Sequence, residues 1–185
     1  MPNSLKKILA WINNVGDLTD TPMSSATANR KAETMIVSMI RRILLVILIL
    51  GMLGTSAELL LIKHTEEPRQ WIPLLLILSS FLVLGWHAID KRPLSMRFFQ
   101  AVMIAFIAAG FAGFYFHYQG AVEFKLESNP SLRGWALFWA AMGTKAPPPL
   151  APGVMIQLGL TGLAYAFRHP ALAASPKNES TNEGE

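Results

Sequence analysis

The chain has 185 residues, of which 52% are apolar and only 15% charged, with a formal net charge of +4 and no cysteine. The charged share is well below that of ordinary soluble proteins, and the missing cysteine excludes disulfides, thiolate metal sites and iron–sulfur clusters. The length allows one domain with short tails, and we assign the positive charge to cytoplasmic Lys and Arg rather than to a nucleic-acid partner.

The first 34 residues are predicted to lie outside the membrane. Four apolar residues near the N-terminus share one helix face: Leu5, Ile8, Leu9 and Ile12. This spacing is typical of a short amphipathic helix on a membrane surface, over residues 1–15, although the same helix could pack on the bundle instead. Residues 16–28 are polar and contain Pro22, so they are predicted to be a linker, and residues 32–39 to be helical up to the first span.

Four apolar stretches are predicted to cross the membrane as helices: residues 43–62, 71–89, 98–116 and 150–167. About 20 residues of helix cover roughly 30 Å, which is the thickness of the hydrocarbon core. The fourth stretch is the shortest and the weakest candidate. The sequence therefore predicts an all-α integral membrane protein whose transmembrane domain comprises residues 35–167.

The segment between the third and fourth spans, residues 119–152, is predicted to lie outside the membrane. Asn129-Pro130 is typical of a helix N-cap followed by proline at the first helical position, and Gly143 is expected to end that helix. A helix over residues 130–143 is too short to span and is predicted to lie on the membrane surface, with a re-entrant hairpin as the alternative. Residues 168–185 are polar and are predicted to be a disordered tail.

The distribution of positive charge predicts the orientation. With four spans, eleven of the 16 Lys and Arg residues fall on the side of the two termini and five on the other side. Because Lys and Arg are enriched in cytoplasmic segments, both termini are predicted to be cytoplasmic, with the protein in a cell membrane of the bacterial inner-membrane kind.

The third predicted span carries small residues at every fourth position: Ala101, Ala105, Ala109 and Gly113. Small side chains let two helices approach closely, which is how apolar helices associate inside lipid. We therefore expect a close helix neighbour on this stripe, either in the same chain or across a dimer.

Glu58 is the only charged residue of the first predicted span. A carboxylate at membrane depth is costly, so it should face the bundle, find a partner or carry a proton. Gln157 of the fourth span is predicted to lie at a similar depth and to donate to Glu58. In having one carboxylate in the first of four spans, the chain resembles the small multidrug-resistance transporters, which are much shorter. A structural hydrogen bond, or a side chain reaching the nearby membrane surface, is the simpler interpretation.

The four histidines fall at the ends of the predicted spans: His64 and His117 at the outer ends, His87 and His169 at the inner ends. Paired histidines suggest the axial ligands of b-type cytochromes, but those ligands lie inside helices and face the core. The four are therefore weak candidates for haem or metal, and we predict interfacial imidazoles, no metal and no cofactor.

The sequence contains none of the nucleotide-binding, hydrolase or metalloprotease motifs, and its segments outside the membrane are short. The leading hypothesis is a non-enzymatic accessory or interaction subunit whose partners are the lipid bilayer and another membrane protein or further copies of itself. The alternative is a small oligomeric transporter or permeation unit coupled to protonation of Glu58, and a b-type haem protein comes third.

Overall fold

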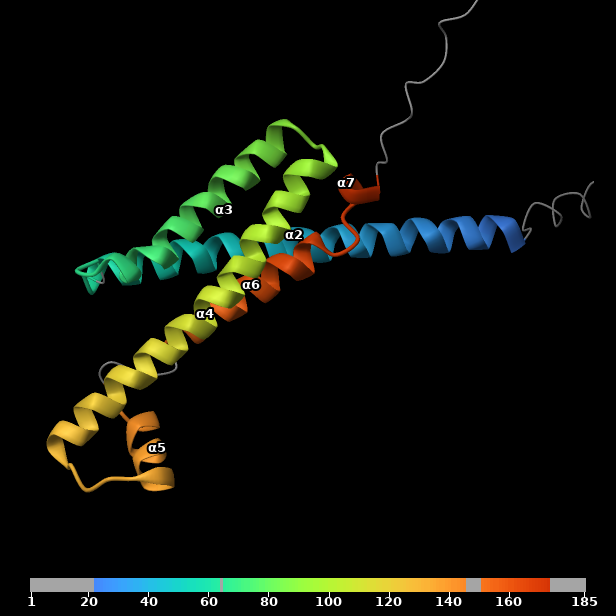
Figure 1. Ribbon diagram of the computed structural model, residues 1–185. Coiled ribbons are helices and arrows are strands. Elements are labelled where there is room, and N and C mark those ends of the chain that lie inside the picture. The colour runs from blue at the N-terminus through green and yellow to red at the C-terminus, as the bar shows by residue number, and fades with distance from the viewer. Residues whose placement is uncertain (1–21, 64, 146–150, 174–185) are drawn as a thin grey trace, which may run out of the picture. The chain divides into compact units, whose positions relative to one another are not determined.

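The computed structural model describes residues 22–63, 65–145 and 151–173 (Figure 1). Every regular element in these ranges is a helix: α2 (Pro22–Leu61), the 3-10 helix η1 (Pro68–Trp71), α3 (Ile72–Ile89), α4 (Pro93–Ser128), α5 (Gly134–Met142), α6 (Gly153–Ala166) and α7 (Pro170–Ala173). The predicted all-α class is confirmed. The chain forms two compact units that divide between Ile43 and Leu44, within α2, and each is described by itself.

Three helical stretches are long and apolar enough to cross a membrane: Thr27–Leu61, Pro68–Ile89 and Pro93–Ser128. They cover the first three predicted spans, although the first ends at Leu61, one residue earlier than predicted, so the membrane-protein character is confirmed at the level of length and composition. The fourth predicted span corresponds to α6, which is apolar but has only 14 residues. At about 1.5 Å per residue, α6 alone covers roughly 21 Å, less than the hydrocarbon core.

The N-terminal part of α2 differs from the prediction. The helix already includes Pro22, so the predicted linker over residues 16–28 is wrong for residues 22–28. The error came from treating polarity as a loop signal, whereas Met23, Ala26 and Ala28 belong to the residue types with strong helix propensity. The predicted amphipathic helix over residues 1–15 lies outside the described residues, as does the predicted tail from residue 174 onward. The prediction of a disordered tail is wrong for residues 170–173, which form α7 and bury Ala171.

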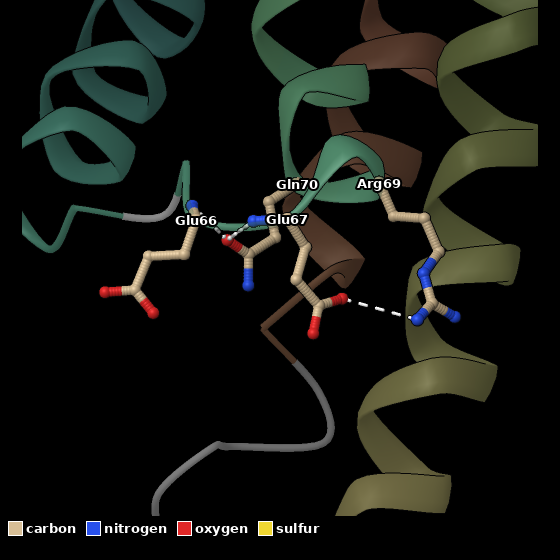
Figure 2. A network of polar contacts seen from close by, with 4 residues as sticks. All are labelled: Glu66, Glu67, Arg69 and Gln70. Carbon is tan, nitrogen blue, oxygen red and sulfur yellow. Dashed lines mark hydrogen bonds and ion pairs between the residues drawn. The ribbon is translucent and has the colours of Figure 1, made fainter.

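The connection from α2 to α3 is organised by its own side chains (Figure 2). The Gln70 side-chain oxygen accepts hydrogen bonds from the backbone N–H groups of Glu66 and Glu67, at 2.8 and 3.1 Å. Arg69 pairs with the Glu67 carboxylate at 3.3 Å, and its guanidinium lies 5.0 Å from the ring centre of Phe116 in α4. The start of α3, which lies where the second span was predicted, is therefore level with Phe116.

α4 is longer than the predicted third span. It has 36 residues and ends at Ser128, so the part of the predicted loop up to Ser128 is helical instead. Hydropathy falls after Phe116, but the residues that follow are good helix formers, and the first strong stop signal is Asn129-Pro130, because proline disfavours helical backbone in the preceding residue. About three turns of α4, residues 117–128, thus extend roughly 18 Å past the start of α3.

The short helix in the third loop exists, but its start was wrongly predicted. Asn129 is the C-cap of α4 rather than an N-cap, and its side-chain oxygen accepts hydrogen bonds from the Ser131 backbone and hydroxyl at 3.2 and 2.6 Å. α5 begins at Gly134, whose φ of +55° favours glycine, and ends at Met142 with Gly143 as its C-cap, where the sequence predicted the end. It packs against the extended end of α4 (Figure 1).

The core of the second unit lies between α4 and α6, with one edge of α2 and of α3 packed against it. Its fully buried residues include Leu48 and Met52 of α2 and Phe99, Met103 and Phe106 of α4. α4 is the central element, since α3, α5, α6 and α7 all contact it.

α4 and α6 approach each other closely through glycines. A Cβ atom added to Gly159 would lie 2.7 Å from the Met103 carbonyl oxygen, and one added to Gly110 would lie 2.5 Å from the Ile156 side chain. Gly162 is as crowded, against the Met103 side chain. Residue numbers rise along α6 as they fall along α4 in these contacts, so the two helices are antiparallel and lie side by side (Figure 1).

Only one residue of the predicted small-residue stripe takes part in the contact between α4 and α6. Gly113 packs against Pro152, whereas Ala105 and Ala109 are half-buried and Ala101 is exposed. For these three alanines a close neighbour remains a prediction. The stripe prediction missed Gly110, because the glycines at the contact are spaced by three residues rather than four.

Candidate functional site

Glu58 lies in the last turn of α2 and its side chain is exposed. Thr55, one turn earlier, is buried at 6% exposure, and together with Leu48 and Met52 it forms the edge by which α2 joins the core. Glu58 therefore lies outside the face that α2 turns toward its own bundle. The expectation that the carboxylate faces the bundle is not met in this arrangement.

Gln157 lies on α6, also exposed, and the structure does not bring it to Glu58. Among the hydrogen bonds of the described residues, none joins the two side chains; the Gln157 carbonyl instead accepts from Thr161 at 2.8 Å. The two helices touch where Leu158 packs on Gly51. Glu58 is seven residues, about 10 Å, beyond Gly51, whereas Gln157 is adjacent to Leu158. The two residues are therefore not opposite each other at the contact between α2 and α6.

Two of the four histidines meet. The rings of His87, at the end of α3, and His169, after α6, are 5.2 Å apart between centroids, edge to face at 75°. Tyr165 stands 5.5 Å from His169 and 5.7 Å from Phe99, which extends the ring contacts into the core. His117 is half-buried in α4, and His64 lies outside the described residues.

His87 is buried and is fixed by a serine at the start of α4. Its Nδ1 lies 2.8 Å from the Ser95 hydroxyl, which is also 3.0 Å from the Asp90 carbonyl and 2.9 Å from that of Arg92. A serine has one hydroxyl proton, so the imidazole is satisfied when its Nδ1–H donates to the Ser95 oxygen and the Ser95 hydroxyl donates to one of the two carbonyls. This network fixes the turn between α3 and α4, together with an Arg92–Asp90 ion pair of 3.1 Å.

This pair of imidazoles does not form a haem site in the arrangement observed. Edge-to-face rings at 5.2 Å are in direct contact, so a porphyrin has no room between them. Within the described parts of the chain, no three His, Asp or Glu side chains gather as metal ligands. The geometry supports a structural role in which His87 joins α3, α4 and the segment that follows α6. The sequence already placed both residues at the inner ends of their predicted spans, but it did not predict that the two rings, 82 positions apart in the chain, lie in direct contact.

A second group of rings lies at the far end of α4. The ring of Phe138 in α5 lies 5.8 Å from that of Tyr118 in α4. Trp135 stacks on Phe138 at 5.0 Å, and Trp139 meets it edge to face at 5.3 Å. Both tryptophans remain largely exposed, at 72% and 63%. Exposed indoles beside an apolar helix are typical of residues at the membrane–water interface. The location of α5 on the membrane surface stays a prediction, and the structure shows that the helix packs against α4.

Comparison of the chain with known protein families, curated proteins and solved structures gives no match. The two candidate sites are therefore judged from their own residues. One is the cluster of His87, Ser95 and His169, which joins helix ends, and the other is the exposed carboxyl group of Glu58.

Proposed function

We propose that the chain is a non-enzymatic membrane subunit that acts by binding another membrane protein through the exposed side of α2. The observation that carries this proposal is the position of Glu58, a carboxyl group within an apolar span that points away from the core contacts of its own helix.

The apolar residues on this side of α2 need no protein neighbour. Ile47, Leu50 and Leu53 are more than half exposed, and acyl chains solvate such side chains as well as a protein does. A carboxyl group is different, since lipid offers no donor and its burial without a partner costs free energy. A neighbouring helix that presents a hydroxyl, amide or cationic side chain at the depth of Glu58 would meet this need.

Four membrane crossings, with both termini cytoplasmic, are part of the same proposal. α6 starts beside Gly113, close to the level where α3 begins, and the chain that follows it reaches His87 at the other end of α3. The path from Pro152 to His169 therefore covers nearly the same depth as α3, although α6 itself is short. With four crossings the bias of Lys and Arg places the termini in the cytoplasm, as in a bacterial inner-membrane protein.

Transport coupled to protonation of Glu58 is the alternative. Because Glu58 does not face α6, such a pathway would have to form between chains rather than through one bundle. We therefore favour the binding function over transport.

The test is crosslinking beside Glu58. Gly54 is one turn away on the same face, and a side chain there meets open space, so a photo-reactive residue at this position should leave the fold intact. In native membranes we expect an adduct with a second, different protein. It should persist with Glu58→Gln, which keeps a hydrogen-bonding group, and be lost with Glu58→Ala.

An adduct that is insensitive to Glu58→Ala would contradict the proposal, as would the absence of any adduct. Adducts formed only with further copies of the chain would also contradict a subunit function and would favour the oligomeric alternative.

A further inference from the structure

The part of α2 that precedes the arginine doublet Arg41-Arg42 carries an apolar face that no described residue of its own unit covers. Every described side chain from Thr27 to Ile40 is exposed, including large apolar ones such as Ile36 and Met39, at 55% and 58%. A helix outside the hydrocarbon core normally buries such a face against protein.

The residues along this face follow the spacing of a coiled coil. Steps of three and four residues alternate along it: Asn29, Ala32, Ile36, Met39 and Ile43. This places Asn29, Ile36 and Ile43 at heptad position a, and Ala32 and Met39 at position d. In the sequence the same alternation continues into the span, through Val46, Leu50, Leu53, Ala57 and Leu60.

Asn29 is the one polar residue among these inner positions, and it lies at the end of the face farthest from the span. A single asparagine at position a lowers the stability of a coiled coil but specifies its register and its number of strands. The amide both donates and accepts hydrogen bonds, so it can pair with the same amide of a second, parallel helix. The polar residue therefore fits a pairing between identical helices.

The other polar residues of this segment mostly occupy the outer heptad positions b, c and f: Arg30, Lys31, Thr34, Ser38 and Arg41. Thr34 and Ser38 donate to backbone carbonyls of their own helix, each at 2.8 Å, so these hydroxyls need no partner. The residues by which α2 joins its own core, such as Leu48 and Met52, also fall at outer positions. The heptad positions of the apolar face, a and d, therefore differ from the positions of the residues by which α2 contacts the core.

The occupant of this face can be inferred from the continuity of the helix and from its charges. α2 is unbroken from Pro22 to Leu61, so this segment is continuous in the chain with the first candidate membrane span. Copies inserted in one membrane have the same orientation, so their α2 helices would be parallel and in register. In that register Met35 at position g faces Ile40 at position e of the second helix, and no like charges oppose each other.

We infer that residues 29–43 of α2 form a parallel two-stranded coiled coil with the same segment of a second copy of this chain. β-branched Ile36 and Ile43 at position a, with unbranched Met39 at position d, favour two strands. The inference goes beyond the proposed function and does not depend on it, since Glu58 falls at an outer position of the same heptad.

Disulfide crosslinking of the full-length chain in native membranes tests the pairing directly. The chain has no cysteine, so each variant carries a single thiol without other changes. In a parallel coiled coil the residues at a and d lie close to their own copies, within the roughly 7 Å between Cα atoms that a disulfide needs. Ile36→Cys and Met39→Cys should form covalent dimers several-fold more completely than the outer controls Val37→Cys and Ser38→Cys.

A charge within the apolar face provides a second measurement. Ile36→Glu should strongly reduce the crosslinking of Met39→Cys, whereas Val37→Glu, on the outer side, should leave it unchanged. Glu58→Ala should also leave it unchanged, which separates this test from that of the proposed function. Equal crosslinking at inner and outer positions, or none at any position, would overturn the inference, and protection of the inner thiols by lipid without dimers would assign the face to the membrane surface instead.

Discussion

Gly159→Ala should destabilise the protein by forcing α4 and α6 apart. The added Cβ would lie 2.7 Å from the Met103 carbonyl oxygen and 3.2 Å from the Ile107 backbone nitrogen. Ordinary contacts begin at about 3.4 Å, so the gap must widen by roughly 0.7 Å. Neither of these atoms can rotate away, because both belong to the backbone of α4. The adjustment must therefore move the helices.

The magnitude follows from two opposing terms. Overfilling a tight contact costs about 1–3 kcal/mol. Replacing glycine by alanine inside a helix returns about 0.5–1 kcal/mol, because alanine loses less backbone entropy on folding. The expected net loss in the free energy of unfolding is centred on about 1 kcal/mol and reaches at most about 2.5 kcal/mol. Gly120→Ala, in α4 with nothing within 4 Å of the added atom, keeps only the favourable term and should be neutral or slightly stabilising.

The assay is reversible unfolding of the two purified variants in mixed micelles, by titration with a denaturing detergent. Helix content measured before titration shows whether each variant starts from the same fold. If Gly159→Ala proves as stable as Gly120→Ala, the reasoning about the α4–α6 contact is refuted, since the two changes differ only in the space around the new methyl group.

Three further predictions concern other parts of the fold. Ser95→Ala should cost about 1–3 kcal/mol of unfolding free energy, because it leaves the buried imidazole at the end of α3 without its acceptor, while Ser79→Ala, which only removes a bond to its own helix, should cost less in the same titration. Ala109→Leu should lower the thermal stability in detergent more than Ala108→Leu, since Ala109 is half-buried and Ala108 exposed; equal tolerance would argue against a close neighbour on the predicted stripe. Reporter fusions should place the end of α4, after Ser128, outside the cytoplasm and the C-terminus inside it, and a C-terminus outside would mean that α6 is not a crossing.

The elements that depend on local properties could be predicted from the sequence. Hydropathy over about 20 residues located the first three spans, and Gly143 marked the end of α5 correctly. Where hydropathy and helix propensity disagreed, hydropathy gave the wrong prediction. Residues 117–128 and 22–28 are polar enough for loops but have the propensity of helices, and with no stop signal before Asn129 the helix of α4 continued.

The contacts between helices were decided only by the tertiary structure. In water, the contrast between polar and apolar faces tells which side of a helix is buried, but a helix in lipid can be apolar all round. The sequence of α2 and α6 therefore leaves each helix free to rotate about its axis. That rotation determines that Glu58 does not face Gln157. It also determines that Gly110 and Gly159, rather than the alanine stripe, form the close contact. The contact between the rings of His87 and His169 likewise depends on how the helices are packed. The length and apolarity of a helix are properties of its own sequence. The direction in which its side chains point, toward a neighbour or toward lipid, depends on the shapes of all the helices that pack together.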